Sequence, residues 1–314
     1  LDVVADPTKE PKGIYVSSFD SSPLAPDYDF VLGDRMEQVQ IGLKALNLLC
    51  SGKVHLSSRK NSPFANLQEV THHVVEGVHP AGNIGTQIHH IDPVNKGEFV
   101  WGINIQDVAA IGKLFESGNV DGKKCIALTG SEAKSPCYYN VYSGSSVRDL
   151  VENNVSRENV RYISGNVLTG DQKELDDYLG FYHNQFTIIP EGNEYKFFLT
   201  TGWLGLGFDK FSNSRLFPTF LLPKSKKFVL DTNTNGEERA FVVTGELERV
   251  FPFDILPMHL TKAAITNDID AMENLGIYEV APEDFALCEY VCTTKINIQE
   301  KIRQGLDLIA SECM

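Results

Sequence analysis

Two cysteines near the C-terminal end of the chain stand at the spacing of iron–sulfur ligands. A four-iron loop reads C-x2-C-x2-C-x3-C-P, because these short spacings let neighbouring thiolates converge on one cluster. Cys288 and Cys292 occupy the last two ligand positions, but Pro282 and Phe285 stand at the first two, and Thr293 replaces the proline. The sequence therefore predicts a loop that keeps its shape and has lost its metal chemistry.

The same spacing occurs once more upstream, where no thiol remains. The four ligand positions there hold Glu246, Arg249, Pro252 and Leu256, and Pro257 follows them. Because iron–sulfur clusters are held by thiolates, neither loop has the ligands for one. The two loops together predict an electron-transfer scaffold that no longer carries electrons through iron.

The cysteine pair leaves a second interpretation open. Cys288 and Cys292 are four residues apart, so on a helix both would share one face and could bind zinc with two outside ligands. Two thiolates are only half of a tetrahedral site, and no third ligand is close in sequence. We favour buried structural thiols over a zinc site.

Histidines offer another candidate metal site. His72, His73, His79, His89 and His90 lie within nineteen residues. Neighbouring residues of a strand point to opposite faces, so each adjacent pair offers at most one ligand to a given ion. No CxxC or HxxxH spacing accompanies them, and we favour ordinary surface and loop histidines over a zinc or iron site.

The segment 76–86 could bind a flat ligand. Its motif His79-Pro80-Ala81-Gly82, followed by Gly85, lets the backbone approach a ligand closely because glycine has no side chain. The glycines do not form GxGxxG, so no dinucleotide-binding fingerprint is present. A plain connection between two elements is the alternative interpretation. The sequence contains no Ser/His/Asp pattern, P-loop or paired carboxylates, and we assign no catalytic residue.

Composition sets the limits for these candidates. The chain has 314 residues, of which 42% are hydrophobic, and this is enough for two or three domains. The net charge of −14 argues against a nucleic-acid-binding face, which needs clustered Lys and Arg. Six sparse cysteines predict free cytosolic thiols, and no stretch of 18 apolar residues predicts a membrane span. Because the chain begins with Leu1 and a linker-like segment, we expect a fragment that lacks an N-terminal part.

Periodicity predicts an α/β arrangement in the first part of the chain. Expected strands cover residues 13–17, 54–56 and 70–75, and expected helices cover residues 34–49, capped by Asp34, and 101–115. Strands that alternate with helices predict a parallel sheet with a right-handed crossover.

The middle part of the chain has a different pattern. Short strands are expected at residues 125–129, 138–142, 161–163 and 186–189, with a helix that begins after Ser145. This order over so short a span predicts a small β-grasp domain. A hairpin of residues 227–230 and 240–243 is expected around the turn Asn235-Gly236.

The last part of the chain, after Pro252, is expected to be mostly helical. The acidic segment 267–273 is typical of a helix N-terminus, where negative charge suits the helix dipole. The final helix carries an apolar stripe of Ile298, Ile302, Leu306 and Ile309. We expect this stripe to pack against its own domain rather than a partner.

Taken in order, several segments resemble one known family. The matching segments are 79–86, 103–115, 163–168, 178–185, 234–239, 254–257 and 286–292. Each is weak alone, but collinear over more than two hundred residues they are specific. They resemble the A subunit of the Na+-translocating NADH:quinone reductase, a bacterial respiratory sodium pump. That family is similar to the C subunit of the Rnf complex and to the NADH-binding flavoprotein subunit of complex I.

The resemblance implies a fold with four regions. These are a Rossmann-like α/β domain at 1–120, an SLBB-type β-grasp domain at 121–200, a connecting region at 201–245, and a helical domain at 246–314. The last domain would resemble a ferredoxin-like domain without clusters. In the A subunit this domain holds no clusters, and the flavin-binding loop of the relatives would lie before Leu1, so this fragment would bind neither metal nor flavin.

The resemblance also implies a role. The chain would be a peripheral subunit on the cytoplasmic face of the bacterial inner membrane, with the other membrane and peripheral subunits of the pump as partners. Ubiquinone would be the substrate, NADH and flavins would bind in other subunits, and the isolated fragment would not be catalytic. The candidate residues for the quinone are His79, Pro80, Gly82, Gly85 and Asn104.

Two other functions remain alternatives. An Rnf-type electron carrier would show eight cluster cysteines, and six of those eight positions hold other residues here. A non-enzymatic module that uses its β-grasp domain to bind a polymer or partner is the second alternative.

Overall fold

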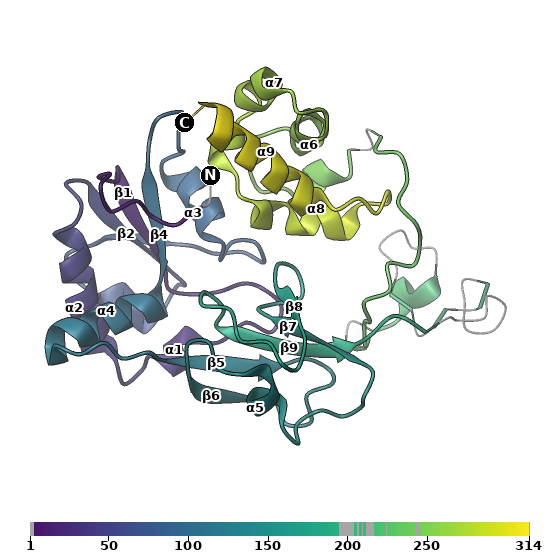
Figure 1. Cartoon of the computed structure of the whole chain (residues 1–314), viewed down its shortest axis with the longest axis horizontal. Helices are drawn as coiled ribbons and strands as arrows, with labels where there is room; N and C mark the ends of the chain where they lie inside the picture. The colour runs from purple at the N-terminus through teal and green to yellow at the C-terminus, as the bar shows by residue number, and fades with distance from the viewer. Residues whose placement is uncertain are drawn as a thin grey trace. The chain divides into compact units, whose positions relative to one another are not determined.

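The computed structural model divides the chain into two compact units (Figure 1). It describes residues 3–194, 204–205, 207–208, 210–211, 217–223, 225–242 and 245–313. Unit 1 consists of Leu1–Cys125, Asn140–Ser143 and Arg239–Met314. Unit 2 consists of Ile126–Tyr139 and Gly144–Glu238.

Unit 1 contains a four-stranded parallel sheet with the strand order β3-β2-β1-β4. The strands are β1 (Gly13–Ser17), β2 (Lys53–Ser58), β3 (Thr71–Val74) and β4 (Val100–Asn104). Alternate residues of the inner strands, such as Ile14 and Leu56, pack into one core with α2 (Met36–Asn47) and α4 (Ile105–Ser117). The prediction of a parallel α/β sheet is therefore confirmed.

The boundaries of two predicted helices were wrong. Residues 101–104 belong to β4 rather than to a helix, because Trp101 and Ile103 alternate with Gly102 with the period of a strand. The helix begins at Ile105, where Asn104 caps it. The N-cap of α2 is Arg35 and not Asp34.

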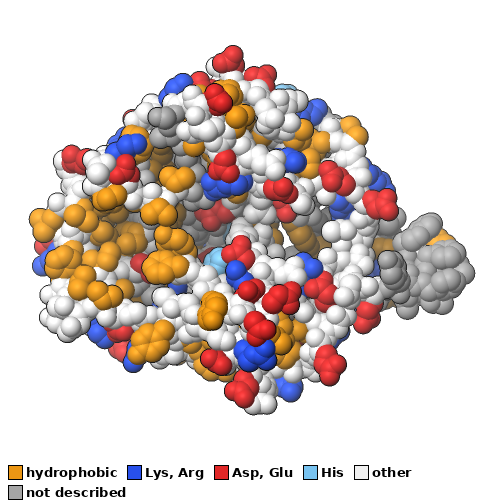
Figure 2. Space-filling view, viewed as in Figure 1, with side chains coloured by type: hydrophobic (Ala, Val, Ile, Leu, Met, Phe, Trp, Pro, Cys, Tyr) orange, Lys and Arg blue, Asp and Glu red, His pale blue; other side chains and the backbone are white. Residues whose placement is uncertain are grey.

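Helices α2 and α4 pack at very short distance through two glycines. A Cβ atom at Gly42 would lie 2.1 Å from the Val108 carbonyl oxygen, and one at Gly112 would lie 1.7 Å from the Gln38 carbonyl oxygen. Only glycine allows backbones to approach this closely. On the face drawn in Figure 2, hydrophobic side chains gather over these two helices, and Phe115 is 67% exposed.

A helix that the sequence analysis missed lies between β3 and β4. This is α3 (Ile84–Ile91), so the last three residues of the expected loop 76–86 are helical. A Cβ atom at Gly102 of β4 would lie 2.9 Å from the Ile84 side chain, which shows how closely α3 approaches the sheet. Two short elements complete this part, α1 (Tyr28–Val31) and a 3-10 turn, η1 (Pro63–Asn66).

The C-terminal part of unit 1 is helical, as predicted. Its elements are η3 (Leu247–Arg249), α6 (Pro257–Thr266), α7 (Ile269–Asn274), η4 (Ile277–Glu279), η5 (Pro282–Phe285), α8 (Ala286–Val291) and α9 (Ile298–Cys313). Asp268 caps α7 by accepting the Ala271 N–H. The apolar stripe of α9 is fully buried in the core of this part, so the prediction that it packs against its own domain is confirmed.

Helix α3 contacts this helical part through His89. The Nε2 atom of His89 accepts the Asp254 N–H over 3.2 Å, and its Nδ1 atom lies 2.9 Å from Oε2 of Glu279. Because Nε2 is an acceptor, the proton lies on Nδ1 and is donated to the carboxylate. The ring also stacks on Phe253, with centroids 4.5 Å apart. These contacts join the two parts of unit 1.

A five-stranded sheet with the order β6-β5-β9-β7-β8 forms the core of unit 2. Its strands are β5 (Lys123–Thr129), β6 (Cys137–Tyr142), β7 (Val160–Ser164), β8 (Asp171–Lys173) and β9 (Gln185–Pro190), accompanied by α5 (Val147–Val151). β5 and β9 are parallel, and β7 is antiparallel to both β8 and β9. The predicted strands are confirmed, but β8 was missed, and Ser146 rather than Ser145 stands at the N-cap of α5.

The predicted hairpin around Asn235-Gly236 was wrong. Residues 227–230 and 240–242 are not in strands, and Val243 lies outside the described residues. Residues between the two predicted strands bind elsewhere instead. Thr232 donates its hydroxyl to Glu191, and the Arg239 N–H donates to the Thr294 carbonyl over 2.8 Å.

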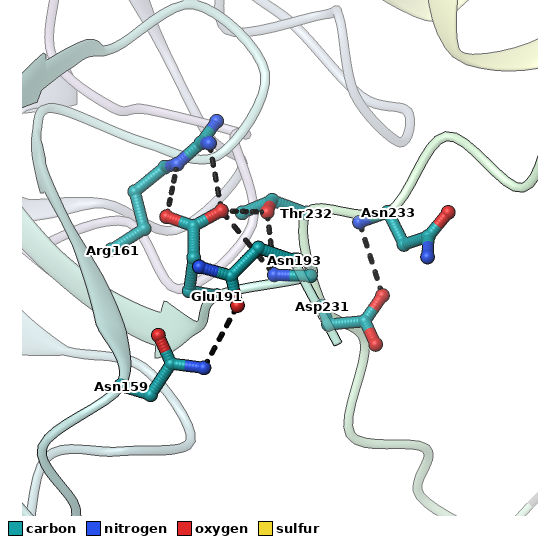
Figure 3. Close-up of polar contacts among 8 residues, drawn as sticks. Asn159, Arg161, Glu191, Asn193, Asp231, Thr232 and Asn233 are labelled. Carbon is teal, nitrogen blue, oxygen red and sulfur yellow. Dashed lines mark hydrogen bonds and ion pairs between the residues drawn. The ribbon is translucent and has the colours of Figure 1, made fainter. Parts of the chain in front are cut away.

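Glu191 holds the segment around Thr232 against the sheet of unit 2 (Figure 3). Its carboxylate accepts two hydrogen bonds from Arg161 of β7, over 3.0 and 2.8 Å. The Gly192 N–H donates to the Thr232 hydroxyl over 2.8 Å, and a Cβ atom at Gly192 would lie 2.1 Å from the Asn233 nitrogen. The paired arginine and carboxylate thus position a segment forty residues further along the chain. A 3-10 turn, η2 (Pro218–Leu221), lies between them in sequence.

Among the residues that the structure describes, no helix combines the length and hydropathy needed to cross a bilayer.

Candidate functional site

The candidate site lies at the carboxyl ends of the parallel strands of unit 1. β1 has β2 on one side and β4 on the other, and Ser17 at the end of β1 is in register with Asn104 at the end of β4. In open parallel sheets, ligands bind outside the carboxyl ends of the strands, where the strand order reverses. The order reverses between β1 and β4, and the segment that follows β1 contacts the segment that follows β3, so these two segments are the first places to look for a ligand.

These two segments bind each other through serine side chains. The Ser17 hydroxyl lies 3.2 Å from the Gly82 carbonyl oxygen, and it accepts a hydrogen bond from the Gln87 side chain over 2.9 Å. The Ser21 hydroxyl accepts the Gly82 N–H over 2.8 Å. The loop before α3 is thus held in place by the residues that follow β1.

Two glycines of the candidate set are explained by packing within the chain. A Cβ atom at Gly82 would lie 2.5 Å from the Ser21 nitrogen. One at Gly85 would lie 2.9 Å from Oδ2 of Asp284, which belongs to η5. Both glycines allow parts of the chain itself to approach the loop. Pro80, which precedes both in sequence, accepts the Asn83 N–H with its carbonyl over 2.8 Å.

His79 presents a buried hydrogen-bond donor in this loop. Its Nδ1 atom lies 3.2 Å from the Ser21 hydroxyl, which already accepts the Gly82 N–H and can therefore donate its own hydrogen to Nδ1. Burial lowers the pKa of His79 and so favours the neutral ring, which carries its proton on Nε2 when Ser21 donates to Nδ1. Nε2 is buried and has no hydrogen-bond partner among the residues that the structure describes.

Three hydroxyl groups in the same two segments are, like His79 Nε2, buried without a hydrogen-bond partner in the described residues. Within the described part of the chain, the buried hydroxyl oxygens without a partner belong to Ser18, Ser22 and Thr86, which are 2%, 7% and 5% exposed. Buried polar groups are nearly always hydrogen-bonded to protein, water or a ligand. Four such atoms thus lie in two segments that contact each other, and their hydrogen-bonding capacity is left to water or a ligand.

Asn104 has a structural role in this arrangement. Its Oδ1 atom accepts the Gln106 N–H over 2.9 Å, which caps α4, and its Nδ2 group donates to the Tyr28 hydroxyl over 2.9 Å. The structure thus brings Asn104 to the same edge of the sheet as the loop 79–85, with its amide held by α4 and α1.

The two loops with iron–sulfur spacing pack against each other in the core of the helical part. Phe285, at the second ligand position of one loop, is fully buried and its ring lies 4.7 Å from that of Phe251. Cys288 lies 3.8 Å from the Leu247 carbonyl oxygen of the other loop. Aromatic rings and buried thiols occupy the interior between the two loops.

The remaining ligand positions lie mostly at the ends of short helices. Glu246 is the N-cap of η3 and Arg249 its last residue, Leu256 is the N-cap of α6 and 53% exposed, and Pro282 is the first residue of η5. Pro252 is half-buried between η3 and α6. Helix ends and the connection between two helices thus occupy these ligand positions.

The thiols of Cys288 and Cys292 are buried and chemically protected. Cys288 is fully buried, and burial raises the pKa of its thiol to about 12. Cys292 is 4% exposed and lies 2.9 Å from the Thr294 hydroxyl. Within the described residues, no group of three or more His, Cys, Asp and Glu side chains is arranged to hold a metal ion.

One group of polar side chains on the sheet was missed. His55 Nδ1 and His73 Nε2 are 2.9 Å apart, and the His55 ring stacks on Tyr15 with centroids 4.7 Å apart. Burial lowers the pKa of both histidines. No sequence pattern indicates this pair, because His55 is isolated and its partner depends on strand pairing. The serines after β1 were a visible signal, since the run Ser17-Ser18-Phe19-Asp20-Ser21-Ser22 follows a strand directly.

Comparison with known proteins identifies the family of the chain. A family model described as the NqrA second alpha/beta domain matches residues 1–120, and one described as the NQRA C-terminal domain, of SLBB type, matches residues 125–174. The A subunit of the Na+-translocating NADH-quinone reductase from Haemophilus influenzae is 41% identical over 308 residues, which cover 96% of this chain and 68% of that protein. The chain belongs to the NqrA family.

Other NqrA proteins match over the same extent. The NqrA protein from Rhodopirellula baltica is 39% identical over 306 residues, 96% of this chain and 66% of that protein. The chain thus spans about two thirds of the length of the curated relatives it matches. A solved structure of an NAD+-reducing [NiFe]-hydrogenase in the H2-reduced state aligns with a TM-score of 0.48 at 10% identity, covering 98% of this chain and 55% of that one. That likeness is too weak to establish a shared fold.

The NqrA models coincide with elements of the structure. The match to the second alpha/beta domain contains the parallel sheet and the loop 79–85, and the SLBB match contains strands β6, β7 and β8. The relatives are named as one subunit of a translocating oxidoreductase, so the NqrA family consists of subunits of a larger enzyme.

Proposed function

We propose that this chain forms part of the NqrA subunit of a respiratory sodium pump that transfers electrons from NADH to ubiquinone. The observation that carries the proposal is the identity of 39–41% over 96% of the chain with proteins named as that subunit. NADH and flavins bind in other subunits, and Na+ crosses the membrane in subunits with spanning helices. This chain is a peripheral subunit on the cytoplasmic face that contributes to assembly and to quinone interaction.

The proposed domains follow the boundaries expected from the sequence. Residues 1–120 form a Rossmann-like domain, which the parallel sheet with order β3-β2-β1-β4 supports. Residues 121–200 form a β-grasp domain of SLBB type, supported by the mixed sheet and the match at 125–174. Residues 201–245 connect this domain to a helical domain at 246–314. The buried thiols at iron–sulfur spacing support its descent from a ferredoxin-like domain.

The proposed quinone site is the loop that contains His79, Pro80, Gly82 and Gly85, together with Asn104 at the end of β4. A quinone is a flat ring with two carbonyl oxygens, each of which accepts hydrogen bonds. The His79 Nε2–H group and the Thr86 hydroxyl are donors without a protein partner in this region. Both donors are buried, so quinone binds here when the loop opens and exposes them.

Membership of the complex is tested by purification. An affinity tag is placed on the complete subunit in its native host, and the membranes are solubilised in a mild detergent. The proposal predicts that the eluate contains the other subunits and reduces quinone with NADH in an Na+-stimulated reaction. An eluate that contains only the tagged subunit, from membranes with this activity, would contradict it.

Quinone binding is tested by titration. A short-chain, soluble ubiquinone is titrated into this chain and into the complete subunit, followed by tryptophan fluorescence. We expect saturable binding to both and about tenfold weaker binding by His79→Leu, which loses a donor worth about 1.4 kcal/mol. The control is His259→Leu, because His259 is exposed on α6. Equal binding by both variants would remove the loop from the site, and binding only by the complete subunit would place the quinone outside these residues.

A further inference from the structure

A loop of unit 2, residues 174–183, is held rigidly by the rest of that unit. The Leu179 N–H donates to the Ser145 carbonyl over 2.9 Å, and the Val147 N–H donates to the Asp177 carbonyl over 3.0 Å. The Leu179 side chain is 2% exposed and packs inward. The first half of the loop is therefore tied to the start of α5 by its backbone and by an apolar anchor.

The second half of the loop is tied to the end of β7. The Ser164 hydroxyl accepts the Gly180 N–H over 2.9 Å, and it lies 2.8 Å from Nδ1 of His183. Since this hydroxyl already accepts one bond, its own hydrogen is available to His183. Ser164 is fully buried, so this connection is shielded from water. We name residues 174–183 the aromatic loop.

The aromatic loop presents three large rings to solvent. Tyr178, Phe181 and Tyr182 are 64%, 65% and 69% exposed, and the Phe181 and Tyr182 rings meet edge to face with centroids 5.0 Å apart. Aromatic side chains are enriched at protein interfaces, and rings that are already fixed lose little conformational entropy when they bind. Three exposed rings on an anchored loop are typical of a binding surface.

Acidic side chains surround these rings. Between residues 171 and 182 there are four carboxylates and one lysine, and all four carboxylates are exposed: Asp171, Glu174, Asp176 and Asp177. Arg148 pairs with Asp176 over 2.5 Å, which leaves an excess of negative charge. Figure 2 shows Asp and Glu side chains gathered over the strands of unit 2 on the face that it draws.

We propose that the aromatic loop is the docking site for a Lys- or Arg-bearing segment of another protein subunit. Cations bind to the faces of Tyr and Phe rings, and neighbouring carboxylates attract the same cations and fix their register. An anionic lipid surface or a nucleic acid is repelled by these carboxylates. The occupant is therefore a basic protein segment.

The structure of membrane proteins narrows the choice of partner. Loops on the cytoplasmic side of membrane-spanning proteins carry an excess of Lys and Arg. A basic loop of a membrane-spanning subunit of the sodium pump is thus the occupant of the aromatic loop. This last step rests on the proposed function, whereas the basic character of the segment rests on the loop itself.

The first test identifies what touches the loop. Tyr182 is replaced by photoreactive benzoylphenylalanine in the complete subunit within its native membranes, and the adduct is located by mass spectrometry. We expect a cross-link to a Lys- or Arg-containing loop of another subunit. The control carries the same replacement at Phe115, which is equally exposed in unit 1, and should not label that loop. Adducts with lipid or a second copy of the chain, or no adduct at position 182, would overturn the proposal.

The second test measures retention on membranes during washes with increasing NaCl. We expect Phe181→Ala/Tyr182→Ala and Glu174→Lys to lower the retained fraction at least tenfold at a salt concentration that releases half of the unchanged subunit. The controls are Phe115→Ala and Glu237→Lys, with equal melting temperatures required of all variants. Retention of the variants equal to that of the unchanged subunit would overturn the docking site alone. Absence of the unchanged subunit from the membranes would overturn the proposed function instead.

Discussion

The carboxylate of Asp284 lies directly against Gly85, although the two residues are almost two hundred positions apart. A Cβ atom at Gly85 would lie 2.9 Å from Oδ2 and 3.1 Å from Oδ1 of Asp284. Asp284 is 2% exposed, and its Oδ2 atom accepts the Ala281 N–H over 2.8 Å. A carboxylate at the first turn of α3 suits the positive end of the helix dipole. The chain itself thus places a negative charge where α3 would attract an external anion.

This contact predicts that Gly85→Ala destabilises the chain. Alanine favours a helix over glycine by about 1 kcal/mol, but overpacking a buried site costs about 1–3 kcal/mol. Because Asp284 is buried and held by Ala281, it has little room to move, and we expect the free energy of unfolding to fall by about 1–2 kcal/mol. Urea denaturation measures this change.

Two controls separate this clash from a general effect of alanine. A Cβ atom at Gly122 would meet nothing closer than the Tyr142 ring at 3.7 Å, so Gly122→Ala should change stability by less than about 0.5 kcal/mol. In the background of Asp284→Ala, the cost of Gly85→Ala should largely disappear. An equal cost in both backgrounds would show that the carboxylate is not the source of the clash.

Local sequence patterns were sufficient to predict an element when its buried residues repeat with a single period along its whole length. The stripe of α9 repeats at three and four residues, so both its helix and its buried face were correct. The prediction of a helix at residues 101–104 was wrong because a strand of period two runs directly into a helix of period 3.6. Four residues are too few to separate the two periods. The hairpin failed because Thr232 and Arg239 bind distant residues, which no turn motif reveals.

The candidate site was predicted only as a loop. The motif from His79 to Gly85 marked a place of close approach, but not what approaches it. Asp284 comes from a segment about two hundred residues away, and the partner of His73 is set by the pairing of β2 with β3. These contacts depend on tertiary structure, and no local spacing in the sequence encodes them.

The pair of His55 and His73 predicts a dependence of stability on pH. Burial lowers the pKa of both rings below the ordinary value of 6.5 in the folded chain, and a charge on His73 lowers the pKa of His55 further, as a charge on His72 does for His73. Between the folded and the ordinary pKa, the unfolded chain therefore binds more protons than the folded chain. The stability from these neutral histidines is fully present above pH 6.5 and is lost as the pH falls through their folded pKa values.

Replacement of one histidine tests this dependence. His73→Gln keeps a hydrogen-bonding group near His55 but does not titrate. We expect the slope of the unfolding free energy between pH 6.5 and pH 5 to decrease, by at most about 1.4 kcal/mol per pH unit. Urea denaturation at several pH values measures the slope. His259→Gln, on the exposed side of α6, is the matched control, and an equal slope in His73→Gln and the unchanged chain would refute the role of the pair.

The buried thiols at iron–sulfur spacing are expected to react slowly with alkylating reagents. Their replacement is expected to leave the bound metal unchanged. The thiolate is the reactive form of cysteine, and a pKa of about 12 leaves Cys288 almost entirely protonated at pH 8. Iodoacetamide should therefore label the exposed Cys313 in the folded chain, and Cys288 only after addition of urea. Peptide mass spectrometry follows both sites in one sample.

The variant Cys288→Ser/Cys292→Ser should keep the iron and zinc content of the unchanged chain and lose about 1–3 kcal/mol of stability, because hydroxyl groups replace buried thiols. Cys313→Ser should lose less than about 0.5 kcal/mol. Metal that disappears with the double substitution would show that these thiols still act as ligands.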